Sequence, residues 1–361
     1  MQYSLCILAA GSGERMLPLT KNINKALLPI NGKAVISHII EKHFDANDIV
    51  IAVNYEKEKI KEYLNCAYAE RKIIFVDVPK IKGHGSGPGY SLICCREYLN
   101  KPFVLSTVDT LYEGNCPKPS QNWMGISKTN NPSIFCTVNI NVQKKVITSI
   151  IDKKNYGTDN AFIGIAGIND YKLFFDNLIN DETLINGEIQ VSNGFKGLIK
   201  KKLKFENFKW FDTGSLDDYL IAEKNFSTGS ESFDFSKKDE YIYFVNNNVI
   251  KYFADPNIIA NRVKRAKKLK NLAPIIKFES KYFYCYSIIN GNVLYEKENQ
   301  FLVSDLLQWL QDELWIKKPL TLIQKKIFFK ACHDFYYKKT LNRIKDYYLR
   351  FNIVDQESFI N

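Results

Sequence analysis

The chain has 361 residues, a length that favours two domains. With 45% hydrophobic and 25% charged residues, the composition favours a packed core and excludes global disorder. It contains no apolar run of about 18 residues or more, so we expect no membrane-spanning helix. The formal net charge of +11 favours anionic partners, but without a recognition motif it does not predict nucleic-acid binding.

Predicted strands and helices alternate through the first part of the chain. Apolar runs predict strands at 3–9, 49–53, 73–78, 103–108, 134–139, 146–151 and 161–168. Apolar side chains at helical spacing predict helices at 33–44, and segments between the strands favour further helices at about 55–64 and 89–99. This alternation is typical of an α/β fold with an open, mostly parallel sheet and helices on both faces.

A polar, turn-rich segment at 227–238 predicts a linker between a domain at 1–226 and a second, α+β domain at 239–361. In the second part we expect strands at 241–245, 249–253, 275–278, 282–288 and 292–296, with a basic helix at 257–271. The pattern after residue 301 is helical.

The cysteines and the N-terminus predict the compartment. The eight cysteines are scattered and include no C-x-x-C pair, which argues against a zinc site and fits a reducing cytoplasm. The chain begins directly with an apolar strand and lacks the basic segment of a signal peptide. We therefore expect a cytoplasmic protein.

The most informative segment joins the first strand to a glycine-rich turn. It reads Leu8-Ala9-Ala10-Gly11-Ser12-Gly13, with Arg15 and Lys25 downstream. The glycines let backbone N–H groups approach a polyphosphate without Cβ clashes. Arg15 adds a forked cation for phosphate oxygens, and Lys25 adds a point charge. Such a loop belongs at the carboxyl end of a strand, where open α/β sheets bind ligands.

In order, the segment contains the strand, the glycine turn, Arg15, Pro18-Leu19-Thr20 and Lys25-Ala26-Leu27-Leu28-Pro29. It resembles the signature of the sugar-phosphate nucleotidyltransferase family, which includes the phosphocholine cytidylyltransferases. The resemblance covers about residues 1–226 and implies transfer of a nucleoside monophosphate to a phosphorylated acceptor. Two positions depart from the family: Ala10 stands where many members have Gly, and Asn24 replaces the usual Pro. Neither departure removes a charge or a backbone donor.

The resemblance also implies roles for residues later in the chain. Asp109, after the strand at 103–108, and Asp212, in Trp210-Phe211-Asp212-Thr213-Gly214-Ser215, would hold Mg²⁺. An isolated aspartate after a strand is otherwise read as a helix cap. Gly85 and Ser86, in a glycine-rich segment at 83–89, would line the base and ribose. Lys153, Gly164 and Glu188 fall in segments that match acceptor-binding parts of the family.

Residues 239–361 resemble the front portion of a choline/aminoglycoside-kinase-like domain. Lys251 stands in place of the phosphate-binding lysine of kinases, and the basic helix and a segment at 335–343 follow. The later H-x-D-x-x-x-x-N and metal-binding Asp motifs are absent, so we expect a truncated domain without kinase activity. A helical appendage used for oligomerisation is the alternative.

A choline-kinase-like neighbour would make a phosphorylated alcohol. We therefore expect a Mg²⁺-dependent cytidylyltransferase that uses CTP and phosphocholine or a polyol phosphate, in cell-surface polysaccharide or lipid synthesis. A hexose-1-phosphate uridylyl- or thymidylyltransferase is the alternative of the same fold. A non-catalytic nucleotide-binding regulator is the alternative of another class, and the intact charged residues argue against it. No nucleic-acid partner is expected, and homo-oligomerisation stays open.

Overall fold

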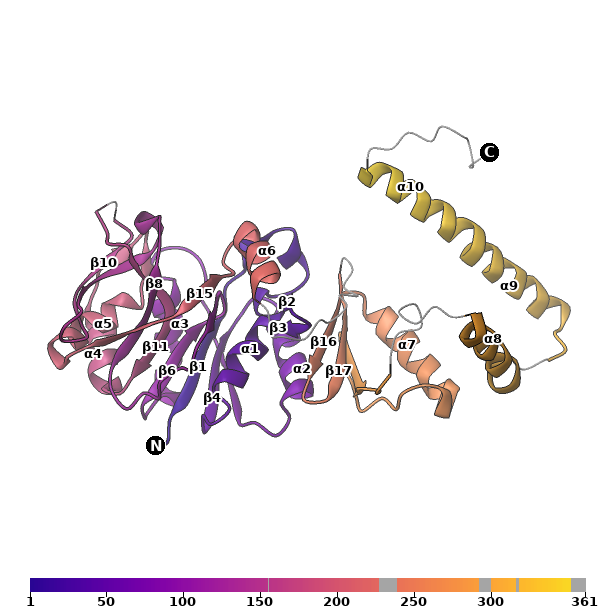
Figure 1. Cartoon of the computed structure of the whole chain (residues 1–361), viewed down its shortest axis with the longest axis horizontal. Helices are drawn as coiled ribbons and strands as arrows, with labels where there is room; N and C mark the ends of the chain where they lie inside the picture. The colour runs from indigo at the N-terminus through magenta and orange to yellow at the C-terminus, as the bar shows by residue number, and fades with distance from the viewer. Residues whose placement is uncertain (155, 227–238, 292–299, 316–317, 352–361) are drawn as a thin grey trace. The chain divides into compact units, whose positions relative to one another are not determined.

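The computed structural model describes residues 1–154, 156–226, 239–291, 300–315 and 318–351 (Figure 1). They form two compact units, Met1–Asn290 and Gly291–Asn361. The linker predicted at 227–238 lies outside the described residues. The boundary between the units lies after Asn290 instead, so the strands that follow the predicted linker belong to the same unit as the glycine-rich turn.

The first unit is built on a nine-stranded sheet with the order β5-β4-β1-β6-β11-β8-β14-β10-β9. The strands are β1 (Ser4–Ala9), β4 (Asp48–Val53), β5 (Ile73–Asp77), β6 (Phe103–Thr107), β8 (Trp123–Lys128), β9 (Cys136–Asn141), β10 (Val146–Asp152), β11 (Asn160–Ile168) and β14 (Lys204–Asn207). Strands β5, β4, β1 and β6 are parallel, as predicted.

The other half of the sheet corrects the expectation of a mostly parallel sheet. β11 pairs antiparallel with β6 and with β8, and β10 pairs antiparallel with β14 and with β9. Only β14 and β8 are parallel there. The physical reason is the connection: a tight turn joins β9 to β10, whereas parallel neighbours need a long crossover, usually a helix.

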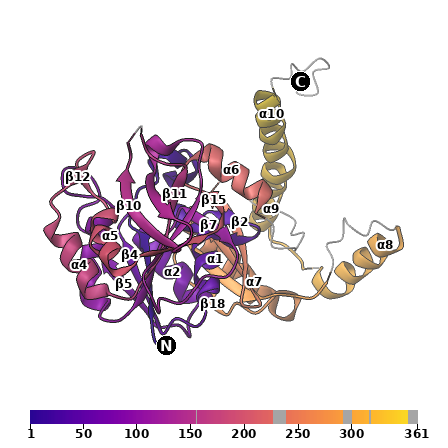
Figure 2. The same cartoon turned by 60° about the vertical axis from the view of Figure 1, so that its left-hand side comes forward.

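Side chains alternate between the two faces of the sheet and create two cores. On β1, Leu5 and Ile7 belong to one core, and Cys6 and Leu8 to the other. Helices α1 (Val35–Lys42) and α2 (Lys57–Ala67) cover the first face. Helices α3 (Pro88–Cys94), α4 (Tyr171–Asn180) and α5 (Ser192–Leu198) cover the second. Figure 2 shows α4 and α5 on this face.

Short elements complete the first unit around the main sheet. They are β2 (Pro29–Ile30) with β3 (Lys33–Ala34), β7 (Thr110–Glu113) with β15 (Lys209–Asp212), β12 (Leu184–Ile185) with β13 (Glu188–Ile189), and α6 (Leu216–Asn225). The β7–β15 ribbon matters for function, because it joins the segment after β6 to a segment about a hundred residues later.

A second, antiparallel sheet has the order β16-β17-β19-β18. It contains β16 (Glu240–Val245), β17 (Asn248–Phe253), β18 (Phe278–Glu279) and β19 (Phe283–Ser287), with α7 (Pro256–Leu269) after β17. These elements confirm the predicted pattern, except that the strand predicted at 292–296 lies outside the described residues. One face of this sheet joins the core that contains α2, and the other packs against α7 (Figure 1).

The second unit is helical, as predicted after residue 301. It contains α8 (Gln300–Trp309), a π-helical turn at Leu310–Leu314, α9 (Leu322–Cys332), a π-helical segment at His333–Lys338 and α10 (Lys339–Phe351). Thr321 and Gln324 form a capping box that begins α9. Within the ranges that the structure describes, every helix is too short or too polar to cross a bilayer.

Candidate functional site

The glycine-rich turn follows β1 at the edge of the sheet. Gly13 has a φ of 66°, and a Cβ atom at this position would lie 3.0 Å from Cγ2 of Thr20. The Thr20 hydroxyl donates to the Gly13 carbonyl over 2.8 Å. Gly13 is therefore required by both backbone conformation and space. The side chains of Leu8 and Ala9 are buried in the cores, so only their backbone is available to a ligand.

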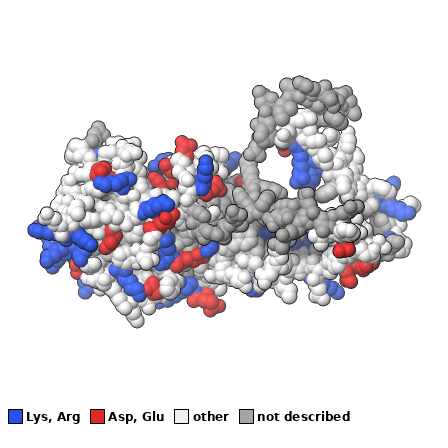
Figure 3. Space-filling model, in the orientation of Figure 1, with Lys and Arg blue, Asp and Glu red and all other residues white. Residues whose placement is uncertain are grey.

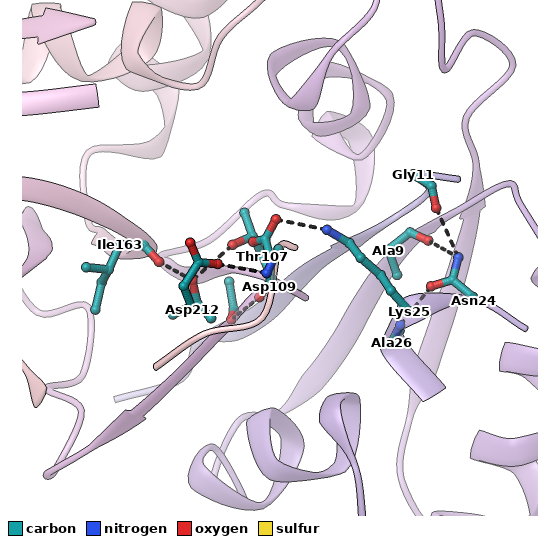
Figure 4. Close-up of polar contacts among 12 residues, drawn as sticks. Ala9, Gly11, Asn24, Lys25, Ala26, Thr107, Asp109, Ile163 and Asp212 are labelled. Carbon is teal, nitrogen blue, oxygen red and sulfur yellow. Dashed lines mark hydrogen bonds and ion pairs between the residues drawn. The ribbon is translucent and has the colours of Figure 1, made fainter. Parts of the chain in front are cut away.

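Asn24 holds this turn in place with a fully buried side chain (Figure 4). Its Nδ2 donates to the carbonyls of Ala9, Gly11 and Tyr55 over 3.1, 3.3 and 2.9 Å. Its Oδ1 accepts from the Ala26 N–H over 2.9 Å. The sequence showed this position only as a departure from the usual Pro. Proline has no side-chain donor or acceptor, so it could not make these bonds.

Two segments far apart in the chain place Asp109 and Asp212 together. The antiparallel register of β7 and β15 pairs Asp212 with Thr110, and the Thr213 N–H donates to the Asp109 carbonyl over 3.0 Å. From the glycine-rich side, Nζ of Lys25 lies 2.9 Å from Oδ2 of Asp109 (Figure 4). Both predicted carboxylates and the predicted lysine thus belong to one cluster.

The two carboxylates have opposite electrostatic character. Burial alone would raise the pKa of Asp109, but the Lys25 ammonium, a Thr107 hydrogen bond and the Arg15 charge lower it to about 2. Burial and the neighbouring Asp109 charge raise the pKa of Asp212 to about 6. The Gly214 N–H donates to Oδ1 of Asp212 over 2.8 Å and opposes this rise. The protein therefore favours the ionised form of Asp109 and disfavours the ionised form of Asp212.

Gly214 lies in the middle of the charged cluster. A Cβ atom at this position would be 3.0 Å from Oδ1 of Asp212 and 3.3 Å from Nη2 of Arg15. It would be 3.7 Å from Cβ of Asp109. Nη2 of Arg15 thus lies close to Gly214, and its charge lowers the pKa of both carboxylates. The sequence contained Gly214 inside the W-x-D-x-G motif but gave no sign that it adjoins Arg15.

Gly164 lies beside the end of β6. Its φ is 86°, and a Cβ atom there would lie 2.2 Å from Oγ1 of Thr107. The pairing of β11 with β8 is irregular between Phe162 and Ala166, which brackets this glycine. The Thr110 hydroxyl also donates to the Ile163 carbonyl (Figure 4). This predicted acceptor residue is thus close to the carboxylate cluster.

The predicted base-binding and acceptor-binding segments form one bridge. The Gly85 N–H donates to the Gly187 carbonyl, and the Ile189 N–H donates to the Ser86 carbonyl, both over 2.7 Å. Ser86 and Glu188 pair as an isolated parallel bridge. The sequence presented these segments separately, because backbone pairing between distant loops leaves no local pattern.

An ion pair between Lys82 and Glu14 links the glycine-rich segment at 83–89 to the turn that follows β1. The bridge and the carboxylate cluster therefore share one edge of the sheet.

Among the described residues, Lys153, a predicted acceptor residue, is not connected to this cluster. It follows β10 with a φ of 51°, and its N–H donates to the Phe135 carbonyl. Within the described ranges, no hydrogen bond or ion pair connects Lys153 to Lys25 or to either carboxylate.

The net charge does not by itself mark a binding face. On the side of the first unit shown in Figure 3, basic and acidic side chains are interspersed, apart from a basic group at the left-hand edge. The charged groups that converge are those of the cluster at the ends of β1 and β6.

The first part of the chain is similar to known proteins. Residues 5–112 match the MobA-like NTP transferase domain. Over 238 residues the chain is 32% identical to the bifunctional protein GlmU of Methanococcus vannielii, covering 61% of this chain and 54% of that protein. Over 109 residues it is 38% identical to the choline-phosphate cytidylyltransferase of Streptococcus pneumoniae, covering 30% and 45%. The chain thus spans about half the length of these curated relatives.

Solved structures show the same fold. A UDP-glucose pyrophosphorylase complexed with UDP-glucose aligns with a TM-score of 0.55 at 21% identity, covering 63% of this chain and 98% of that one. The CTP:phosphocholine cytidylyltransferase of Streptococcus pneumoniae aligns with a TM-score of 0.52 at 23% identity, covering 63% and 100%. The predicted Rossmann-like nucleotidyltransferase fold is confirmed. The matched family domain ends at residue 112, and the kinase-like interpretation of 239–361 stays a hypothesis.

Proposed function

We propose that the chain is a Mg²⁺-dependent nucleotidyltransferase, which joins a nucleoside monophosphate from an NTP to a phosphomonoester and releases pyrophosphate. The observation that carries the proposal is the convergence of Arg15, Lys25, Asp109 and Asp212 around Gly214. Polyphosphate needs cations and backbone donors, and its divalent ion needs carboxylates. The matched NTP transferase domain supports the same reaction class.

In this proposal, the NTP binds over the glycine-rich turn, and a phosphate oxygen of the acceptor attacks the α-phosphorus in line. The bond to the β-phosphate oxygen breaks, and pyrophosphate leaves with that electron pair. Arg15 and backbone N–H groups hold the departing charge, and Lys25 screens the two phosphates as they approach. Positioning and charge stabilisation do the work, so no covalent enzyme intermediate is needed.

The donor atoms at Asp109 and Asp212 fit Mg²⁺. Among the described residues, no group of three or more His, Cys, Asp or Glu side chains could hold a metal ion. With two carboxylates, phosphate oxygens of the NTP and water would supply the remaining ligands. Burial and the Asp109 charge raise the pKa of Asp212, so a cation bound beside it would favour its ionised form. When bound, Mg²⁺ would neutralise charge on the α-phosphate and on the leaving pyrophosphate.

For the substrates, we propose CTP and a phosphorylated alcohol, such as phosphocholine or a polyol phosphate. The 38% identity to a choline-phosphate cytidylyltransferase over 109 residues supports this choice. Gly85 and Ser86 would line the base and ribose, while Lys153, Gly164 and Glu188 would serve the acceptor. Cell-surface polysaccharide or lipid synthesis would consume such a product.

A hexose-1-phosphate uridylyl- or thymidylyltransferase is the second candidate. It is favoured by the 27% identity over 111 residues to the UTP–glucose-1-phosphate uridylyltransferase AglF of Haloferax volcanii. A UDP-glucose pyrophosphorylase is also among the structures with the same fold.

The deciding experiment measures pyrophosphate release by the full chain over four NTPs and a panel of phosphomonoesters. The panel contains phosphocholine, glycerol phosphate, a polyol phosphate, glucose 1-phosphate and N-acetylglucosamine 1-phosphate. We expect CTP with a phospho-alcohol to give the highest rate, and Asp109→Asn to lower it about 10²-fold or more. Asp176→Asn, an exposed aspartate on α4, is the matched control. Preference for UTP or dTTP with a sugar phosphate would select the second candidate. If no substrate pair gave pyrophosphate release, a non-catalytic nucleotide-binding regulator would be favoured.

We also propose that residues 239–361, which resemble the front portion of a kinase-like domain, do not catalyse phosphoryl transfer. Lys251 lies on β17, and the carboxylates that kinases use for Mg²⁺ and for the attacking hydroxyl have no recognisable motif here. Incubation with ATP and free choline, glycerol or polyols should give no phosphorylated alcohol. Formation of such a product would mean that this part of the chain is a complete kinase.

A further inference from the structure

The segment that carries Lys25 contacts the second sheet through two buried tyrosines. The Tyr243 hydroxyl donates to the Leu27 carbonyl, and the Tyr252 hydroxyl donates to the Asn22 carbonyl, both over 2.7 Å. Both tyrosine side chains are fully buried. The two accepting carbonyls lie on either side of Lys25, three residues before it and two residues after it.

Further contacts from the same side fix the ends of this segment. Nδ2 of Asn22 donates to Oδ1 of Asp239 over 2.9 Å, and the Phe244 N–H donates to the Gly32 carbonyl over 2.7 Å. The Asn22 carbonyl also accepts from Nζ of Lys59 on α2. Lys59 in turn lies 4.6 Å from the ring centre of Tyr282, next to β19.

The segment needs such partners because it has little regular structure of its own. Lys25 begins a single 3₁₀ turn, Lys25–Leu27, between extended residues. A turn of this kind leaves most of its carbonyls without partners in the local chain. Asn24 ties the segment to the glycine-rich turn, and the tyrosines tie it to the second sheet. The place of the Lys25 ammonium, 2.9 Å from Asp109, therefore depends on both.

We propose that the sheet β16–β19 is part of the nucleotidyl-transfer module, and that Tyr243 and Tyr252 are positioning residues that act through Lys25. The proposal rests on the proposed function and extends it to residues after 226. All transferase motifs lie before residue 227, so sequence alone would assign the reaction to 1–226. In the structure, a chain cut at 226 would leave the Asn22 and Leu27 carbonyls without these donors.

The test uses the full chain with Tyr243→Phe and Tyr252→Phe, singly and together. Each change removes a hydroxyl and keeps the ring in the core. We expect the double variant to lower kcat about tenfold or more, since misplaced catalytic groups are costly, with a smaller change in KM. Tyr284→Phe is the control, because this buried tyrosine of β19 packs with the core on the α7 side. It should leave kcat within about twofold.

A second comparison separates positioning from general destabilisation. If the tyrosines act through Lys25, the double change should lower kcat less than about twofold in a Lys25→Ala background. An equal loss in both backgrounds would overturn the proposal, as would an unchanged kcat in the double variant. Should the double variant fail to fold, the single Tyr252→Phe variant is compared in the same two backgrounds.

Hydrogen exchange provides a readout that does not depend on the reaction. The amides of Leu27 and Leu28, which bond within the 3₁₀ turn, should exchange faster in the double variant and not in the control. Unchanged exchange of these amides in the double variant would mean that the tyrosine hydroxyls do not hold the Lys25 segment in place. If the wild-type chain releases no pyrophosphate with any substrate, the proposed function fails, while the exchange result still decides whether the sheet holds this segment.

Discussion

Replacing Asp212 with Asn should stabilise the ligand-free protein while removing most of its activity. Burial and the Asp109 charge raise the pKa of Asp212 from 3.8 to about 6. Between these two pH values the folded protein holds a proton that the unfolded chain has lost, so stability falls as the pH rises through this window. At about 1.4 kcal/mol per unit, the ionised carboxylate costs the fold about 3 kcal/mol above pH 6.

The Asn side chain keeps an oxygen for the Gly214 N–H and carries no charge. At about pH 7.5 the variant should therefore gain up to about 3 kcal/mol of unfolding free energy, and the gain should vanish near pH 4. In a unit of this size that gain corresponds to a Tm increase of about 6 °C. For Asp109, stability depends on pH with the opposite sign. Its pKa is lowered to about 2, so the stability that its ionised form contributes is lost only as the pH falls below about 4.

Urea denaturation in EDTA at both pH values measures this effect, with the exposed Asp176→Asn as the matched control. Addition of Mg²⁺ and the NTP should reverse the order, because ligand binding stabilises the protein that binds it better. Turnover of the variant should fall about 10²-fold. A variant less stable than wild type at about pH 7.5, or a stability difference that does not change with pH, would refute the reasoning.

Three further substitutions test single parts of the site. Lys25→Ala should lower pyrophosphate release about 10²-fold with an unchanged circular dichroism spectrum, and near wild-type turnover would remove this lysine from the site. Asn24→Ala should cost about 2 kcal/mol or more in urea denaturation, because it leaves buried partners unpaired, and a smaller loss would mean that water replaces the amide. Gly164→Ala should lower the Tm, because its Cβ would lie 2.2 Å from Oγ1 of Thr107 at a φ of 86°, whereas Gly11→Ala, with open space around it, should not.

Local sequence patterns predicted the elements that depend only on near neighbours. The apolar run of β1, the helical spacing of α1 and the glycines after Ala10 are encoded within a few residues each. The parallel half of the sheet follows from the alternation of these strands and helices. Several strands were missed. β7 and β15 have only four residues each, β14 contains Lys, Glu and Asn, and β8 contains Gly, Ser and Lys, so their apolar patterns are weak.

The site residues divide in the same way. Gly13, Arg15 and Lys25 could be predicted from sequence because they lie in one continuous segment after β1. Asp109 was predicted because the family resemblance assigns a role to the aspartate after the strand at 103–108. The meeting of Asp212 with Asp109 is set by the register of the β7–β15 ribbon. No local window encodes that register, since it depends on which distant backbone groups pair.

The roles of Asn24 and of the second sheet were decided by tertiary structure alone. A buried amide and a surface amide look the same in sequence, and only packing shows that Asn24 bonds three carbonyls. The sequence determined strands β16 and β17 and suggested a separate domain. Packing decided instead that their tyrosines enter the core shared with α2, because burying these large rings removes more apolar surface from water than an independent small sheet could.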